Sequence, residues 1–179
     1  MLTAETTALI VIDVQGKLAR SMYNAETMLQ CITRAIQGAK ILGIPVLHIE
    51  QYPQGLGATL PEVSELLADQ TPMSKTTFDC CGNPEIVSRI ESLNKTNLLV
   101  CGLEAHICVY QSVRSLLSKG YNVEIIEDAI SSRTAENRAL GLNRMTAAGA
   151  QRTSVEMCLF DLVQDAASPA FRQLLPLFK

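Results

Sequence analysis

The chain has 179 residues, of which 47% are hydrophobic and 18% are charged, and its formal net charge is -3. This length favours a single domain over residues 1–179, and the apolar content excludes a disordered chain. The acidic balance argues against a nucleic-acid partner, because such proteins gather basic residues against phosphates. No apolar run reaches the roughly 20 residues that a membrane-spanning helix needs, so no membrane partner is expected.

Short apolar runs rich in β-branched residues alternate along the chain with segments of helical periodicity. The predicted strands cover residues 8–14, 45–50, 73–77, 97–102, 121–126 and 150–154. The predicted helices cover residues 24–42, 62–68, 84–93, 105–119, 134–148 and 155–164. Strands separated by helices pair in parallel through right-handed crossovers. The predicted fold class is therefore α/β, a three-layer α/β/α sandwich around a mostly parallel, Rossmann-like sheet of about six strands.

The six cysteines bear on cellular location and on metal binding. The first residues show no secretion leader, so the thiols are expected to be reduced and the protein cytoplasmic. No CxxC pair occurs, and only His48 and His106 accompany the cysteines. The sequence therefore predicts no metal site and no cofactor.

Three reactive side chains stand at or near the carboxyl ends of predicted strands, where ligands bind in parallel sheets. These are Asp13, Lys75 and Cys108, the last at the start of a predicted helix. A thiol attacks as thiolate, which a helix N-terminus and a lysine favour, and a carboxylate can carry its proton. Each residue alone has an ordinary alternative, namely a buried thiol, a turn aspartate and a surface lysine.

Four segments in the same order resemble the isochorismatase-like hydrolases. They read ALIVIDVQ, HIEQYPQGLGATLPE, SKTTFDCCGNPE and LLVCGLEAHICVYQSVRSLLSKGYNVEIIEDAISSR, and the tail TSVEMCLFDL extends the likeness to small single-domain members. The resemblance implies that Cys108 is the nucleophile, Asp13 the general base and acid, and Lys75 the residue that helps activate the thiol. It also implies a cis peptide between Leu103 and Glu104.

Departures from the family narrow the predicted substrate. Nicotinamidases of this family carry an Asp-x-His-x-x-His metal set after the second strand, whereas this chain has HIEQYPQGLG there. His48 is expected to pack in the core, and nicotinamide is a doubtful substrate. Members that cleave vinyl ethers can lack the cysteine, so Cys108 favours acyl chemistry at an amide or related carbonyl.

Further residues are predicted to line the substrate site. Gln15 either points into the pocket or pairs with a loop, and Phe78 either walls the pocket or packs in the core. Leu103 and Glu104 lie at the strand–helix junction before Cys108. Glu104 can instead hydrogen-bond nearby backbone, and His106 is expected to cap or to lie at the surface. Cys80 and Cys81 are either packing residues or a second reactive thiol site.

The predicted function is Cys-dependent cleavage of a C–N bond in a small amide or carbamoyl-type molecule. The alternatives are a catalytically silent scaffold that binds a protein partner, isochorismatase-type vinyl-ether hydrolysis, and nuclease activity. A homo-oligomer is expected, because family members commonly assemble and the last helices leave aliphatic surface to cover.

Overall fold

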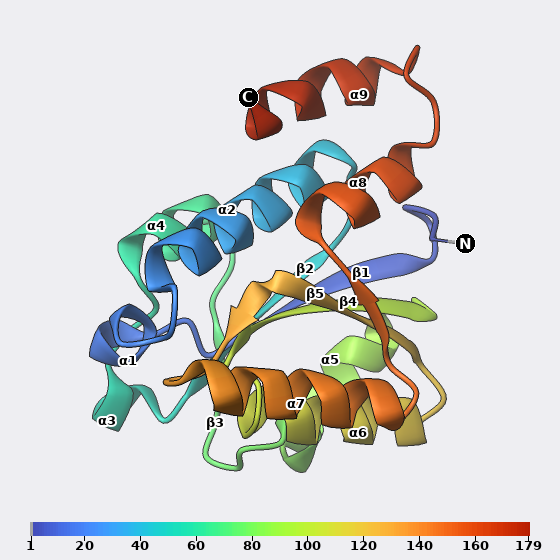
Figure 1. Ribbon diagram of the computed structural model, residues 1–179. Helices are drawn as coiled ribbons and strands as arrows, with labels where there is room; N and C mark the ends of the chain where they lie inside the picture. Colours follow the sequence, from blue (N-terminus) through green and yellow to red (C-terminus); the bar gives the residue numbers. More distant parts are fainter. Residues whose placement is uncertain (1) are drawn as a thin grey trace.

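A computed structural model describes residues 2–179 and contains one six-stranded sheet with helices on both faces (Figure 1). All strand pairs are parallel, and the strand order is β3-β2-β1-β4-β5-β6. The strands are β1 (Thr7–Ile12), β2 (Val46–Gln51), β3 (Met73–Lys75), β4 (Asn97–Leu103), β5 (Asn122–Ser131) and β6 (Gln151–Thr153). The chain reverses its direction of winding between β1 and β4, which makes their carboxyl ends the topological switch point.

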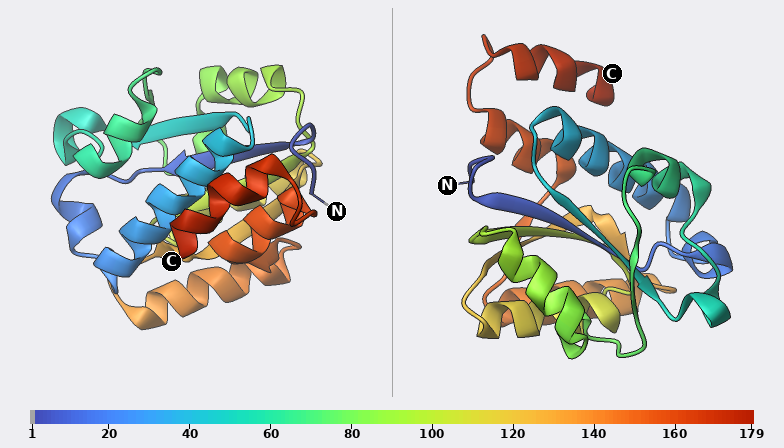
Figure 2. Two further views of the ribbon diagram at one scale, coloured as in Figure 1. Left: turned by 90° about the horizontal axis from the view of Figure 1, so that it is seen from above. Right: turned by 180° about the vertical axis from the view of Figure 1, so that it is seen from behind.

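The helices form the two outer layers of the sandwich (Figures 1 and 2). They are α1 (Gly16–Arg20), α2 (Ala25–Ile41), α3 (Pro53–Leu56), α4 (Pro61–Ser64), α5 (Pro84–Ser92), α6 (Cys108–Ser118), α7 (Ala135–Ala147), α8 (Val155–Val163) and α9 (Pro169–Leu174), with 3-10 turns η1 (Glu65–Leu67), η2 (Cys80–Gly82) and η3 (Leu175–Phe178). Helices α2, α4, α8 and α9 contribute to the core on one face, and α5, α6 and α7 contribute to the core on the other. The α/β/α sandwich predicted from the sequence is confirmed.

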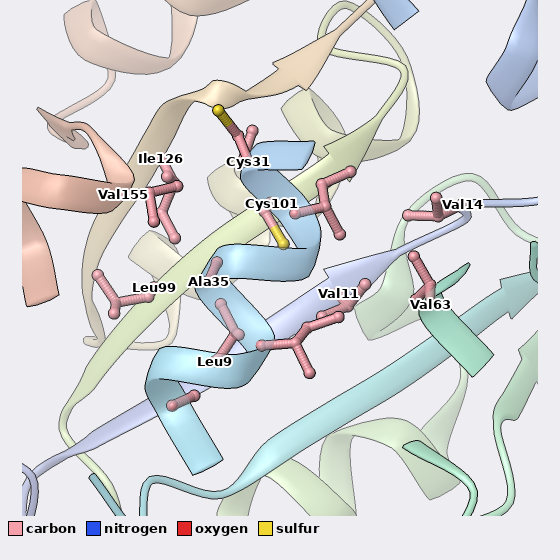
Figure 3. Close-up of a cluster of buried hydrophobic side chains, with 14 of the residues drawn as sticks. Leu9, Val11, Val14, Cys31, Ala35, Val63, Leu99, Cys101, Ile126 and Val155 are labelled. Atoms are coloured by element: carbon pink, nitrogen blue, oxygen red, sulfur yellow. The ribbon is translucent and has the colours of Figure 1, made fainter. Parts of the chain in front are cut away.

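Strand β1 shows why a parallel sheet arises from this sequence. Its six residues are all buried, and successive side chains point to opposite faces. Leu9 and Val11 pack beneath α2, as Figure 3 shows, whereas Ile10 and Ile12 belong to the core on the other face. A strand covered on both faces needs apolar residues at every position, which is the continuous run seen in the sequence.

Most predicted elements occur with ends shifted by one to three residues, but α1, α3 and α9 were not predicted. The largest difference in a strand is in β5, which continues to Ser131, five residues past the predicted end at residue 126. The predicted strand ended just before two acidic residues, Glu127 and Asp128. In the structure Glu127 pairs with Arg152, and Asp128 accepts a hydrogen bond from the Val155 N–H, so both acidic residues fit in the strand.

No helix among residues 2–179 has the length and hydropathy that a bilayer crossing requires.

Candidate active site

Asp13 directly follows β1 at the switch point. Its backbone φ is 57°, in the left-handed region that aspartate tolerates better than most residues. Its N–H donates to the carbonyl oxygen of Ile49 at the end of β2, over 3.0 Å. The side chain is buried, so its carboxylate lies inside the protein instead of capping a surface turn.

Lys75 is the last residue of β3, and its side chain is also fully buried. The ammonium Nζ donates to Asp13 Oδ2 over 2.8 Å and to Gln51 Oε1 over 2.6 Å. The Gln51 amide nitrogen donates to the carbonyl of Thr76, which holds the segment after β3. The carboxyl ends of β1, β2 and β3 are therefore joined through one buried ammonium group.

Gln51 was missed as a site residue in the sequence. Its position as the last residue of β2, beside the strands that end at Asp13 and Lys75, was the available signal. The register was needed to use it, because Gln51 pairs with Lys75 across β2 and β3.

Cys108 is the first residue of α6 and is almost fully buried. The helix begins three residues later than the predicted start, so the thiol is carried by its first turn. Among residues 2–179 the Cys108 N–H donates to no acceptor, which leaves it free at the positive end of the helix. The peptide bond between Leu103 and Glu104 is cis, as the resemblance implied.

Burial and the Asp13 carboxylate raise the pKa of the Cys108 thiol to about 12, against a smaller lowering by Lys75. Burial also raises the pKa of Asp13, although Lys75 opposes this shift. Each residue contributes to the pKa of the other, so the thiol and the carboxylate interact directly. The resting form of the site is a neutral thiol beside an Asp13–Lys75 ion pair.

The four predicted substrate-lining residues have different environments. The Gln15 amide nitrogen donates to the carbonyls of Gln51 and Gly57, and its oxygen accepts from the Gln51 N–H. Gln15 thus pairs with the loop after β2 and has no N–H left for a substrate. Leu103 is fully buried in the core beneath the site, while Phe78 is 55% exposed and so does not pack in the core.

Glu104 and His106 tie the segment before Cys108 to the turn after β5. Glu104 accepts from Arg133 Nε over 2.8 Å, so it forms an ion pair instead of a bond to backbone. His106 Nδ1 lies 2.9 Å from the hydroxyl of Ser132. These two contacts fix the entrance to α6 from the neighbouring strand.

His48 lies buried in β2, as the sequence predicted. Its Nε2 is 2.7 Å from Thr59 Oγ1, and burial lowers its pKa, so the ring is neutral near pH 7. The Thr59 N–H and hydroxyl both donate to Glu50. This buried group holds the loop that Gln15 also braces.

A cleft of about 340 Å³ opens beside Lys75, and Tyr52, Thr77 and Asn83 are among its lining residues. A larger hollow of about 730 Å³ lies between α2 and α4 and shares no residue with the site. The cleft beside Lys75 is thus the one of the two that borders the site, although Asp13 and Cys108 are not among its lining residues.

Comparisons with known proteins agree with the fold. A family model described as the isochorismatase domain matches residues 7–157. The secreted isochorismatase effector Isc1 of Phytophthora sojae is 35% identical, over 99% of this chain and 87% of its own. Isochorismatase domain-containing protein 2 of Xenopus laevis is 34% identical, over 94% and 82%.

Among solved structures, the MAR1 ribonuclease from Caenorhabditis elegans superposes with a TM-score of 0.93 at 35% identity, covering 99% of this chain and 91% of that one. The sequence likeness, the family model and the parallel sheet agree over nearly the whole chain. The chain therefore belongs to the isochorismatase family, whose members are generally hydrolases.

Proposed function

We propose that the protein is a cysteine hydrolase that cleaves a C–N bond in a small amide or carbamoyl-type substrate. The observation that carries this proposal is the buried Asp13–Lys75 ion pair, which interacts with the thiol at the first turn of α6. Burying a charge pair carries a desolvation cost, so such a pair contributes little to stability for its own sake, and strongly shifted pKa values gather at functional sites.

In the proposed reaction, Asp13 takes the proton of Cys108 as sulfur attacks the carbonyl carbon. The raised pKa of Asp13 suits this role, because a stronger base sits closer in pKa to the thiol. Lys75 balances the negative charge as it moves from carboxylate to sulfur. The free N–H of Cys108 is placed to donate to the developing oxyanion, and such a donor typically lowers the barrier by about 3–4 kcal/mol.

The second half of the reaction returns the proton. Asp13 protonates the leaving nitrogen as the C–N bond breaks, and a thioester remains on Cys108. Water then attacks the thioester, giving a proton to Asp13, and the carboxylic acid leaves as the thiol re-forms. In this proposal Gln15 and Leu103 support the catalytic residues without contacting the substrate. Phe78 and Glu104 are the proposed neighbours of the substrate.

The test is a screen of small amides, carbamoyl compounds and isochorismate against the wild type, Cys108→Ala and Asp13→Asn. We expect turnover of an amide by the wild type, loss in both variants, and an acyl adduct on Cys108 visible by mass spectrometry. Full turnover by Cys108→Ala would refute the thioester route. Turnover of isochorismate alone would favour vinyl-ether hydrolysis.

A second candidate is ribonuclease activity, because a structure 35% identical to this chain carries that name. The net charge of -3 speaks against binding to a polyanion. RNA binding and cleavage measured at increasing salt distinguish ribonuclease activity from amide cleavage: RNA cleavage that needs Cys108 and weakens steeply with salt would replace the amide proposal.

A third candidate, the catalytically silent scaffold, predicts no acyl adduct with any compound.

We also propose a cytoplasmic homo-oligomer, with the assembly supported by large exposed apolar side chains. Tyr52, Phe78, Leu140 and Met157 are each more than half exposed. Sedimentation equilibrium is expected to give a mass above 19.5 kDa, and a monomer at all concentrations would contradict this.

The proposed cytoplasmic location is supported by the six cysteines, which are all unpaired, as expected in a reducing compartment. Fractionation of the native cells tests this location, since the Phytophthora sojae relative is named as secreted.

A further inference from the structure

A second cluster of chemically reactive groups lies outside the catalytic residues, in the 3-10 turn η2. The carboxylate of Asp79 and the thiols of Cys80 and Cys81 have ligand atoms that all lie within 4.8 Å of one another. The two sulfur atoms are 4.0 Å apart. No other group of three such residues comes together in the described part of the chain.

We propose that Asp79, Cys80 and Cys81 form a binding site for a thiophilic divalent cation of the zinc and cadmium class. The sulfur separation carries the argument. Two thiolates bound to zinc at about 2.3 Å with a tetrahedral angle lie about 3.8 Å apart, close to the distance between Cys80 and Cys81. Binding therefore requires little movement of either side chain.

The carboxylate is already oriented for this role. Asp79 Oδ1 accepts from the Cys81 N–H over 2.8 Å, and Oδ2 accepts from the hydroxyl of Ser115 over 2.5 Å. Hydrogen bonds of this kind hold metal-ligating carboxylates in place. Each oxygen keeps a second lone pair for a cation.

The turn that carries the two thiols is held in place by the neighbouring helix α6. The Ser112 hydroxyl accepts the Cys80 N–H over 3.0 Å, which fixes the turn against α6. A cation that binds both sulfurs displaces both thiol protons, so two S–H bonds are lost, two metal–sulfur bonds form and two protons go to solvent.

Access and geometry suit a site with three protein ligands. Asp79 and Cys81 are partly exposed, while Cys80 is fully buried, so a cation enters from the solvent side of the turn. The fourth tetrahedral position is left for water or a further ligand. The site is distinct from Asp13, Lys75 and Cys108, so the catalytic proposal stands or falls without it. It also departs from the sequence prediction of no metal site.

The test uses Cd²⁺ as the probe, in protein that carries Cys108→Ser to remove the catalytic thiol. Thiolate-to-cadmium absorption in the ultraviolet and native mass spectrometry report binding. We expect one cation per chain, with thiolate absorption, and loss of both signals in the Cys81→Ser variant and in the Cys80→Ser/Cys81→Ser variant. Cys81 is partly exposed, so its single variant is expected to fold even if loss of Cys80 disturbs the core.

Cys158→Ser is the matched control, because it removes a buried thiol on the opposite face of the sheet. It should keep both signals, and Asp79→Asn should weaken binding about 10-fold or more. Equal binding by Cys81→Ser, loss of binding in Cys158→Ser, or the absence of thiolate absorption in every protein would each overturn the proposal.

Discussion

At the scale of single residues, Asp13 has two opposing effects on the proposed nucleophile. Its negative charge raises the pKa of Cys108, yet it is also the proposed acceptor of the Cys108 proton. Lys75, which lowers the same pKa, is held on Asp13 and Gln51. Alkylation of the thiol and catalytic turnover therefore depend on Asp13 in opposite directions.

Asp13→Asn is expected to speed alkylation of Cys108 by iodoacetamide while it abolishes turnover. Removing the carboxylate removes one cause of the raised pKa and leaves the lowering by Lys75, so more thiolate is present at a given pH. The measurement is the alkylation rate of Cys108 between pH 7 and pH 10, followed by peptide mass spectrometry. A slower rate in the variant would contradict this account of the pKa.

Lys75→Met is expected to destabilise the fold by about 3–5 kcal/mol, because Asp13 is left buried without its ammonium partner. Urea unfolding at pH 7 measures the loss, and the Asp13→Asn/Lys75→Met protein should recover part of it. Lys40→Met is the matched control: it breaks an exposed ion pair with Asp69, which water screens, so the stability loss should be much smaller. Equal losses in the two single variants would refute the importance of the buried pair.

At the scale of elements, the position of Cys108 depends on how closely α7 approaches the segment before α6. A Cβ added at Gly141 in α7 would lie 2.4 Å from the carbonyl oxygen of Ala105. This segment is held on its other side by the Ala105 N–H, which donates to Ser131 at the end of β5 over 2.8 Å. A larger residue in α7 must therefore move the backbone that leads to the nucleophile.

Gly141→Ala is expected to lower both stability and turnover, although alanine is intrinsically better in a helix by about 1 kcal/mol. Gly38→Ala in α2 is the control, because its added Cβ would meet the end of the Leu159 side chain, which can rotate. We expect a smaller stability loss there and unchanged kinetics per folded molecule. Thermal unfolding measures the stability of each variant, and steady-state turnover measures its activity. A stabilised Gly141→Ala protein would contradict the close approach of α7 to the segment before α6.

At the scale of the whole molecule, thiols lie buried in the cores on both sides of the sheet. Burial raises the pKa of Cys31 to about 11 and that of Cys158 to about 12, and it also raises the pKa of Cys101. The unfolded chain ionises these groups near the ordinary value of 9.0, before the folded protein does. The folded state then holds more protons, so stability is fully present below pH 9 and falls as the pH rises above it.

Urea unfolding is therefore expected to show a falling free energy of unfolding from pH 9 to pH 11, in one cooperative transition if residues 1–179 form a single domain as predicted. In Cys158→Ala the slope should be smaller by about 1.4 kcal/mol per pH unit, the contribution of one proton. The slope is compared with that of the wild type, because the substitution also leaves a cavity. An unchanged slope would show that Cys158 ionises equally in both states.

The sequence by itself determined the order of the strands along the chain, the main helices between them and the α/β/α sandwich, and its resemblance to a known family implied the three proposed catalytic residues. The fold follows from local signals, namely continuous apolar strands such as β1 and helix periodicity. The family and the catalytic roles rest instead on the likeness of several segments to known members of the family. Asn83 shows another local interaction, since its side chain accepts a hydrogen bond from the Glu85 N–H and so caps α5. Periodicity indicates which residues are buried, and strands buried on both faces are typical of a parallel sheet covered by helices.

Only the tertiary structure decided how those residues interact. The role of Gln51 depends on the register between β2 and β3, and the bracing by Gln15 depends on Gln51 at the end of β2, 36 residues away. The neutral state of the Cys108 thiol depends on burial and on a carboxylate from another strand, which no local pattern encodes. The spacing of Cys80 and Cys81 from Asp79 likewise depends on side-chain directions in a turn held by α6, since distances across a fold arise from packing and not from sequence separation.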